Sequence, residues 1–254
     1  EKTFTWDKYR KRLVSPIRIE NGQKFLNKYM INFIAAEKEF GVPKEIIASI
    51  IGIESSYGSI KGSTRVIDSL ATLSFDYPRR SKFFKIQLEN FLLLSREENF
   101  DPLKLNGSYA GAMGYGQFLP DSYRDLAIDF DEDGVRDIIN NPVDAIGSVA
   151  NYLKGKGWQK DANIAVEATL VDKQNPISTI WQMKKKNYLE LKPKNQTEFD
   201  DLKSETYLQV SVSDKSYWIG GENLKVLSRY NKSSFYIIAV FLLSKELAFT
   251  LNEV

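Results

Sequence analysis

The stretch PKEIIASIIGIESSYGS, residues 43–59, has the pattern of a helix with one acidic residue on its apolar face. Pro43 suits the first turn of a helix, and Gly58 suits its end. Positions at offsets of 0, 3, 7 and 10 share one face of such a helix, and here they hold Ile47, Ile50, Glu54 and Tyr57. The spacing therefore predicts a helix that carries Glu54 beside isoleucines.

The carboxylate of Glu54 is the candidate catalytic acid of the chain. Aliphatic neighbours remove water from the charged form, so the pKa of this carboxyl is expected to rise and the proton to remain near neutral pH. A protonated carboxyl can donate its proton to a leaving oxygen. The alternative is that Glu54 lies at the edge of the stripe, solvated or paired with a cation.

Composition bounds the class of protein. The 254 residues, 43% of them hydrophobic, suffice for one large domain or two modest ones. A formal net charge of +2 argues against a nucleic-acid or membrane-surface protein. The chain contains no Cys and no His, which excludes thiol chemistry, Ser-His triads and zinc sites built on those ligands.

Neither membrane spans nor a leader segment are apparent. The most apolar stretch, FYIIAVFLLSKELAF at 235–249, is short and carries two charges, which predicts a buried helix. The chain starts at Glu1 without Met or a signal-like segment, so we expect a mature or trimmed form.

The sequence pattern changes twice along the chain, from helical to β-prone and back. From about residue 3 to 158 helical periods dominate and predict an all-α half, with helices over 23–40, around Glu54, and over 79–96 and 142–154. Between about 160 and 225 short β-prone runs follow, at 164–170, 188–192 and 207–212, and predict a small β subdomain. From 224 to 251 the periods are helical again, which predicts a return to the helical body.

An acidic segment at 128–148, IDFDEDGVRDIINNPVDAIGS, resembles the first half of an EF-hand calcium loop. Loop positions 1, 3, 5 and 7 supply oxygens, and Gly134 occupies position 6. Position 12 is Asn140 rather than Glu, so the loop must be longer and closed from elsewhere. The candidate metal ligands are Asp129, Asp131, Asp133, Val135 and Asp144. We expect a structural Ca²⁺ here; the alternative is an acidic turn or a helix cap.

The glycine-rich segment GSYAGAMGYGQFLP at 107–120 permits close approach of backbones and suits a ligand groove lined by Tyr115 and Gln117. Glycine-rich turns between packed helices are the alternative. No phosphate-binding glycine motif occurs, so no organic cofactor is expected. Tyrosines, 13 in all, offer a ring face and a hydroxyl to sugar rings, although each taken singly also suits packing.

Five motifs occur together and in order: IIGIESSYG, DSLATLSFDYPRR at 68–80, the glycine-rich segment, the acidic loop running into NPVDAIGSVANYL, and LSRYNKSSFY at 227–236. In this combination the chain resembles the B family of membrane-bound lytic murein transglycosylases, from about Tyr9 to Tyr236. The residues after Glu54, Ser55 to Tyr57, differ from those of many relatives, which leaves subsite preference open.

The resemblance implies a mainly α fold with a lysozyme-like core. It implies a catalytic part over 1–158, which contains an extra helical part at about 62–106 and the EF-hand-like loop at 129–144. It further implies that a mainly β subdomain over 159–223 is inserted before the last helix and that the chain returns to the helical core over 224–254. It implies Glu54 as catalytic acid and a calcium site. The implied substrate-binding residues are Tyr9, Arg79, Arg80, Ser108, Tyr115, Gln117, Tyr152, Tyr230, Asn231 and Tyr236.

The chemistry implied is cleavage of peptidoglycan without water. Ordinary glycosidases use two carboxylates, and no second acid near Glu54 is free of the predicted metal loop. Glu54 would protonate the oxygen between N-acetylmuramic acid and N-acetylglucosamine while the acetamido carbonyl of the substrate attacks the anomeric carbon. The Glu54 carboxylate would then take the proton of the C6 hydroxyl, which closes a 1,6-anhydro ring.

Two other functions stay open: a lysozyme-type hydrolase of the same fold, and a cell-wall binding or scaffold protein without turnover. The expected partners are glycan strands, with other cell-wall enzymes as further candidates and no nucleic acid, and the expected state is a monomer. The resemblance places the protein in the bacterial periplasm, anchored to the outer membrane through a lipidated segment upstream of Glu1.

Overall fold

The computed structural model describes residues 5–172, 182–213 and 215–251, so the outermost ends of the predicted 1–158 and 224–254 ranges lie outside it. These residues form two compact units. Of the described residues, unit 1 comprises 5–20, 41–46, 153–172, 182–213 and 215–251, and unit 2 comprises 21–40 and 47–152. Three of the four points at which the chain passes from one unit to the other lie within helices. The domain boundaries predicted from the sequence stay a prediction.

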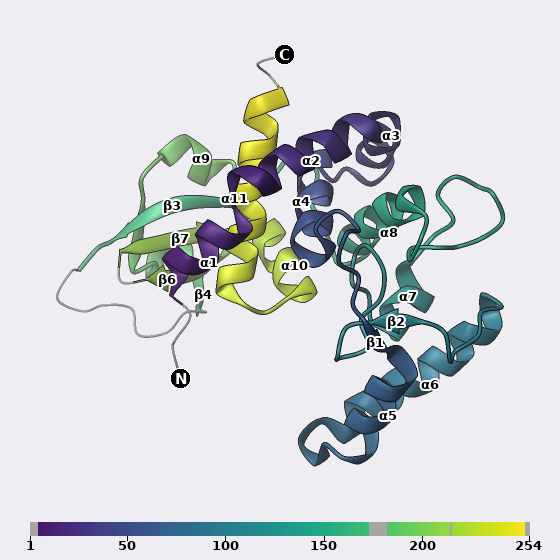
Figure 1. The fold of residues 1–254 in the computed structure, drawn as a ribbon. Coiled ribbons are helices and arrows are strands. Elements are labelled where there is room, and N and C mark those ends of the chain that lie inside the picture. Colours follow the sequence, from purple (N-terminus) through teal and green to yellow (C-terminus); the bar gives the residue numbers. More distant parts are fainter. Residues whose placement is uncertain (1–4, 173–181, 214, 252–254) are drawn as a thin grey trace. The chain divides into compact units, whose positions relative to one another are not determined.

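The first 155 residues are mostly helical (Figure 1). In chain order the elements are α1 Trp6–Leu13, α2 Pro16–Lys28, α3 Met30–Phe40, α4 Lys44–Ser55, β1 Thr64–Arg65, α5 Val66–Phe75, the 3-10 helix η1 Pro78–Arg80, α6 Ser81–Glu97, β2 Asn106–Gly107, α7 Pro120–Leu126 and α8 Pro142–Gly155. Within unit 2, α5 and α6 lie side by side, and β1 pairs with β2 in antiparallel fashion. These two short strands were not expected in a half predicted to be all-α.

Two of the predicted helices differ from those observed. The helix expected over 23–40 is two helices, because the chain breaks at Tyr29 between α2 and α3. The helix that carries Glu54 ends at Ser55, and Tyr57 lies beyond it with a left-handed φ of 59°. The prediction that Tyr57 continues the helical face of Glu54 was therefore wrong, whereas Ile47 and Ile50 are fully buried as expected.

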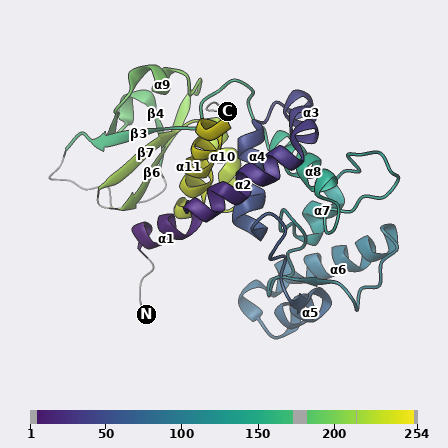
Figure 2. The same cartoon turned by 45° about the horizontal axis from the view of Figure 1, so that its top comes forward.

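Unit 1 contains a five-stranded antiparallel sheet (Figure 2). Its strand order is β4-β6-β7-β3-β5. The elements are β3 Ala165–Leu170, β4 Gln182–Lys185, η2 Lys186–Tyr188, β5 Leu191–Pro193, α9 Gln196–Asp200, β6 Thr206–Ser213 and β7 Ser216–Gly220. The prediction of strands within 160–225 is confirmed.

The two faces of this sheet pack on different partners because side chains alternate along each strand. On one face Tyr217 and Ile219 join a core with Phe199 of α9, whose ring stacks on Tyr207 at 4.9 Å. On the other face Trp218 contacts Phe241 with ring centroids 5.8 Å apart. The sheet therefore carries a core on both sides.

Two C-terminal helices follow the sheet, α10 Glu222–Tyr230 and α11 Ser234–Leu251. The helix predicted at 235–249 is confirmed, and its residues from Tyr236 to Phe241 are all buried as expected. Toward its end Lys245, Glu246 and Phe249 are exposed, so the prediction of burial holds for the first part of the helix only. Of the helices in the described ranges, none combines the length and apolarity that a bilayer crossing requires. A mainly α fold with a small sheet placed before the last helices is thus confirmed.

Candidate active site and acidic loop

Glu54 lies in the last turn of α4 and is half-buried. The preceding turns of this helix are anchored in the interior, with Ile50 and Ile51 fully buried. The end of the helix is closed by Ser55, whose hydroxyl donates to the Ile51 carbonyl at 3.1 Å and accepts from the Gly58 amide at 3.0 Å. The backbone that carries Glu54 is therefore held on both sides.

Three consecutive residues after α4 adopt the left-handed conformation: Ser56, Tyr57 and Gly58 have φ values of 49°, 59° and 86°. Glycine adopts this conformation without cost, but Ser and Tyr rarely do. Strained backbone of this kind concentrates at functional sites. The strain directly follows the candidate acid.

Aromatic rings pack against this turn. The Tyr57 ring covers Gly52, and the Tyr115 ring covers Gly58 so closely that a Cβ at either glycine would collide with it. Phe25 lies between them, with its centroid 5.6 Å from that of Tyr57 and 6.2 Å from that of Tyr115. The end of α4 is thus enclosed on one side by aromatic rings. Burial of the Tyr115 phenol raises its pKa, and the neighbouring Tyr29 raises it further, so the phenol stays protonated.

The glycine-rich segment lies against the loop that leaves α4. Gly62 approaches Gly107 and Ser108 so closely that no Cβ would fit between them. Gln117, which has a left-handed φ of 51°, donates from Nε2 to the carbonyl of Lys61 at 3.2 Å and to that of Gly114 at 2.9 Å. The structure therefore brings Ser108 and Gln117 to the loop that follows Glu54.

Ser108 forms a tight turn. Its Oγ accepts from the amides of Ala110 at 3.3 Å and Ala112 at 3.0 Å, and its carbonyl accepts from Gly111 at 2.9 Å. These bonds fix the hydroxyl of Ser108 at the surface of the segment. Because the Ser108 oxygen already accepts two hydrogen bonds, its hydroxyl is suited to donate one to a ligand.

The other predicted substrate-binding residues lie elsewhere. In unit 2, the exposed Arg79 and Arg80 belong to η1, and Tyr152 in α8 is buried against Phe118. In unit 1, Tyr9 of α1 packs on Phe235 at 5.5 Å. The remaining three belong to α10, the turn after it and α11 in the same unit: Tyr230, Asn231 and Tyr236. That these residues share one groove with Glu54 stays a prediction.

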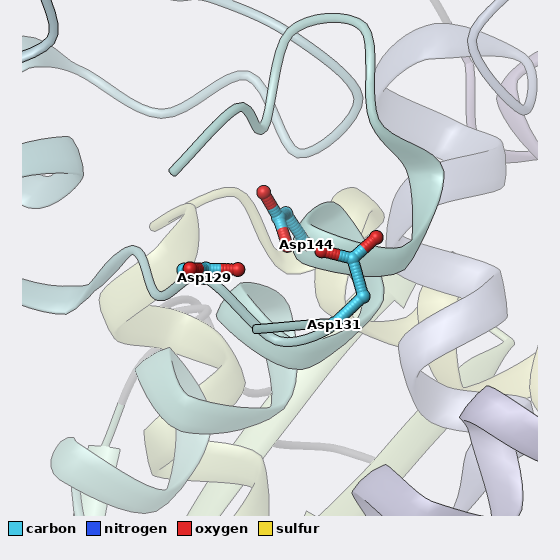
Figure 3. A group of neighbouring side chains, drawn as sticks. All are labelled: Asp129, Asp131 and Asp144. Atoms are coloured by element: carbon cyan, nitrogen blue, oxygen red, sulfur yellow. The ribbon is translucent and has the colours of Figure 1, made fainter. Parts of the chain in front are cut away.

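Three carboxylates of the acidic loop converge: Asp129, Asp131 and Asp144 offer oxygens within 4.8 Å of one another (Figure 3). Asp144 comes from the first turn of α8 and is fully buried. Its two oxygens accept from the amides of Phe130 at 2.8 Å and Asp137 at 2.7 Å. It therefore joins the start of the loop to its end.

The remaining predicted ligands behave differently. Asp133 is exposed and accepts from the amide of Val135 at 2.8 Å, and it is not part of the group of three. Asn141 was not predicted, yet its amide donates to Asp131 at 2.9 Å. The sequence indicates a helix that begins at the next residue, Pro142, but the spacing of the acidic residues does not predict a role for Asn141. Whether Asp133 and the Val135 carbonyl bind a cation stays a prediction.

The electrostatics of the loop fit a divalent cation. Burial raises the pKa of the Asp144 carboxyl, the charges of Asp131 and Asp129 raise it further, and the two backbone hydrogen bonds oppose the rise. A cation among the three carboxylates would remove this repulsion. The atoms that could bind a metal are all carboxylate oxygens, which suit Ca²⁺ or Mg²⁺ rather than a softer metal.

The transglycosylase SLT domain family matches residues 1–245 of the chain. The chain belongs to this family. It is 43% identical over 246 residues to membrane-bound lytic murein transglycosylase B of Escherichia coli strain K12, a match that spans 96% of the chain and 67% of that protein. The family expected from the five linked motifs is thereby confirmed.

Solved structures agree with this assignment to the transglycosylase SLT family. The Escherichia coli lytic transglycosylase Slt35 in complex with calcium superposes with a TM-score of 0.87 at 40% identity, covering 98% of this chain and 80% of that one. SltB3 of Pseudomonas aeruginosa in complex with NAG-NAM-pentapeptide superposes with a TM-score of 0.83 at 30% identity, covering 96% and 67%. The predicted fold class, mainly α with a lysozyme-like core, is confirmed by these likenesses.

Proposed function

The chain is a lytic transglycosylase acting on peptidoglycan, and we propose that it cleaves the β-1,4 bond between N-acetylmuramic acid and N-acetylglucosamine and leaves 1,6-anhydromuramic acid ends. The family match over 1–245 carries this proposal. The names and ligands of its relatives, a murein transglycosylase and a protein bound to NAG-NAM-pentapeptide, support the substrate.

Glu54 is the proposed acid and base of both steps. It first donates its proton to the glycosidic oxygen as the acetamido carbonyl of the muramoyl residue attacks the anomeric carbon, which releases the N-acetylglucosamine hydroxyl. It then removes the proton of the C6 hydroxyl, whose oxygen attacks the same carbon and frees the acetamido group. The burial of α4 and the closed turn after it support this role, since both hold the carboxyl in one place.

The polar groups beside that turn are proposed to bind the glycan. Ser108 can donate to a substrate carbonyl, and Gln117 keeps its carbonyl oxygen for a substrate N–H while its amide is held by the backbone. Tyr115 offers a ring at the end of α4. Arg79 and Arg80 are proposed to meet stem-peptide carboxylates, which suits their exposure.

The tyrosines of the other parts complete the proposal. Tyr152, Tyr9, Tyr230 and Tyr236, with Asn231, are proposed glycan-binding residues on the strength of the family motifs that contain them. Localisation in the periplasm, with an anchor to the outer membrane, is proposed from the membrane-bound relative.

Release of soluble fragments tests the activity. Purified protein incubated with bacterial sacculi should solubilise them, whereas binding without release would show a scaffold and contradict the proposal. Chitin oligomers, which lack muramic acid and its peptides, serve as the control substrate and should remain largely uncut.

We further infer that Asp129, Asp131 and Asp144 hold a structural Ca²⁺, with Asp133 and the Val135 carbonyl as additional proposed ligands. The convergence of three carboxylates supports this, as does the calcium complex of the related Slt35. The proposed cation lies in a loop rather than among the groups assigned to chemistry, so its role is to hold 129–144 together.

Adding Ca²⁺ should raise the melting temperature, because a ligand that binds only the folded state stabilises it by about 2.7 kcal/mol at 100 times its Kd. The variant Asp131→Asn should lose most of this rise. Asp125→Asn, which removes an exposed carboxylate of α7 in the same unit, serves as the matched control and should keep it. Identical melting curves with Ca²⁺ and with EDTA for the unaltered protein would refute the site.

A further inference from the structure

Lys61, in the loop that leaves α4, contacts three residues in two other parts of unit 2. Its ammonium donates to the carbonyl of Ile139 at 2.8 Å and lies 5.1 Å from the centroid of the Tyr115 ring. Its own carbonyl accepts from Nε2 of Gln117 at 3.2 Å. A lysine in a loop is ordinarily solvated, but this one is half-buried and is bonded through both its side chain and its backbone.

The partners of Lys61 are themselves joined. The Tyr115 amide donates to the carbonyl of Ile138 at 3.1 Å. Gly114 has a left-handed φ of 74°, and a Cβ there would collide with the same carbonyl, so the two backbones are in direct contact. Tyr115 and Gln117 are therefore held between the Lys61 loop on one side and residues 138–139 on the other.

Residues 138–139 form the end of the acidic loop. The amide of Asp137 donates to Asp144, the buried member of the carboxylate group, at 2.7 Å. Asp137 in turn accepts from the Ile139 amide at 2.9 Å. A continuous path of hydrogen bonds thus runs from Asp144 through 137–139 to Lys61, and from Lys61 to Gln117.

We propose that Lys61 is a positioning residue that fixes Gln117 and Tyr115 for glycan binding and couples them to the acidic loop. The inference rests on the proposed function of the site. Cation occupancy of the loop orders 137–139, Lys61 transmits this order to the glycine-rich segment, and glycan and Ca²⁺ therefore each strengthen the binding of the other. Reciprocity of this kind is a requirement of linked binding.

The substitution Lys61→Met tests the proposal because it keeps the aliphatic stem and removes the ammonium. Loss of a hydrogen bond from a charged donor should weaken glycan binding by about tenfold. KM should rise by this factor while kcat changes far less, since the chemistry of Glu54 is untouched. Lys61→Arg should restore binding, because a guanidinium can donate to the Ile139 carbonyl and stack on Tyr115.

The matched control is Lys104→Met, which removes an exposed lysine of the same unit whose ammonium lies 3.4 Å from the Asp101 carboxylate. It should bind glycan as the unaltered protein does. A Lys61→Met protein with native KM and native binding would overturn the proposal. Equal losses of binding in Lys61→Met and Lys61→Arg, with lowered melting temperatures in both, would show a merely structural lysine and overturn it as well.

Calorimetry in the Glu54→Gln background measures the coupling without turnover. Soluble N-acetylglucosaminyl-N-acetylmuramoyl peptides should raise the affinity for Ca²⁺, and the Lys61→Met change should abolish that increase. If Glu54→Gln protein with native Lys61 fails to bind these glycans, the proposed function fails. If it binds them with an affinity independent of Ca²⁺ and of Lys61, the proposed role of Lys61 fails and the proposed function stands.

Discussion

Replacing Glu54 by Gln should lower kcat/KM on peptidoglycan by about 100- to 10,000-fold while the fold and glycan binding persist. The amide has the shape of the carboxyl but can neither deliver a proton to the glycosidic oxygen nor take one from the C6 hydroxyl, and general acid–base groups contribute factors of about that size. Because the single acid is proposed to serve both steps, no other carboxylate should rescue it. Release of soluble fragments from sacculi measures turnover, and binding of soluble muropeptides measures the intact site.

The matched control for this change lies on the same helix. Glu45, in the first turn of α4, pairs with Lys44 at 2.8 Å, and Glu45→Gln alters the same chemical group away from the proposed site. It should leave turnover within a factor of about two, because Glu45 lies at the opposite end of α4 from Glu54. Residual activity of the Glu54→Gln protein within tenfold of the native value would remove Glu54 from the mechanism.

Gly62→Ala should destabilise the protein strongly. Gly62 has a left-handed φ of 97°, and the added Cβ would collide with the backbone carbonyl of Gly107. The left-handed conformation costs a non-glycine residue roughly 1–2 kcal/mol, and overpacking adds roughly 1–3 kcal/mol. We expect a loss of about 2–5 kcal/mol in the free energy of unfolding, measured by denaturant titration, with weakened glycan binding because Ser108 must move.

Gly157→Ala separates the two contributions. Gly157 has nearly the same φ, 96°, but a Cβ there would meet nothing closer than a guanidinium nitrogen of Arg229 at 4.0 Å. It should therefore lose only the conformational part, about 1–2 kcal/mol. Equal losses in the two variants would mean that the close contact of Gly62 with Gly107 is unimportant.

Periodicity and motif order were enough to predict much of this fold. The helix over 142–154 was predicted to within one residue, because Pro142 marks a start and the apolar spacing is regular. The strands β3 and β6 were predicted from short β-prone runs. Two helix ends were not predicted, the break at Tyr29 and the end of α4 at Ser55. Both lie in sequences whose local pattern continues the helix.

In the candidate site, too, some features were predicted from local sequence and others were not. The place of Glu54 on a helix with buried isoleucines, and the convergence of Asp129, Asp131 and Asp144, were predicted from single segments, since each depends on local spacing. Lys61 was missed, because its role arises from contacts with Ile139 and Gln117 far along the chain. A lysine in a polar turn carries no local feature that distinguishes it from a solvated one.

Mass spectrometry of the fragments released from sacculi tests the central claim most directly. A transglycosylase that closes a ring with the C6 hydroxyl yields muropeptides ending in 1,6-anhydromuramic acid, which are lighter by one water than the hydrolysed products. We predict anhydro ends on the released chains. Reducing muramic ends would instead show that water attacks the anomeric carbon, and would make the chain a hydrolase with the fold of a transglycosylase.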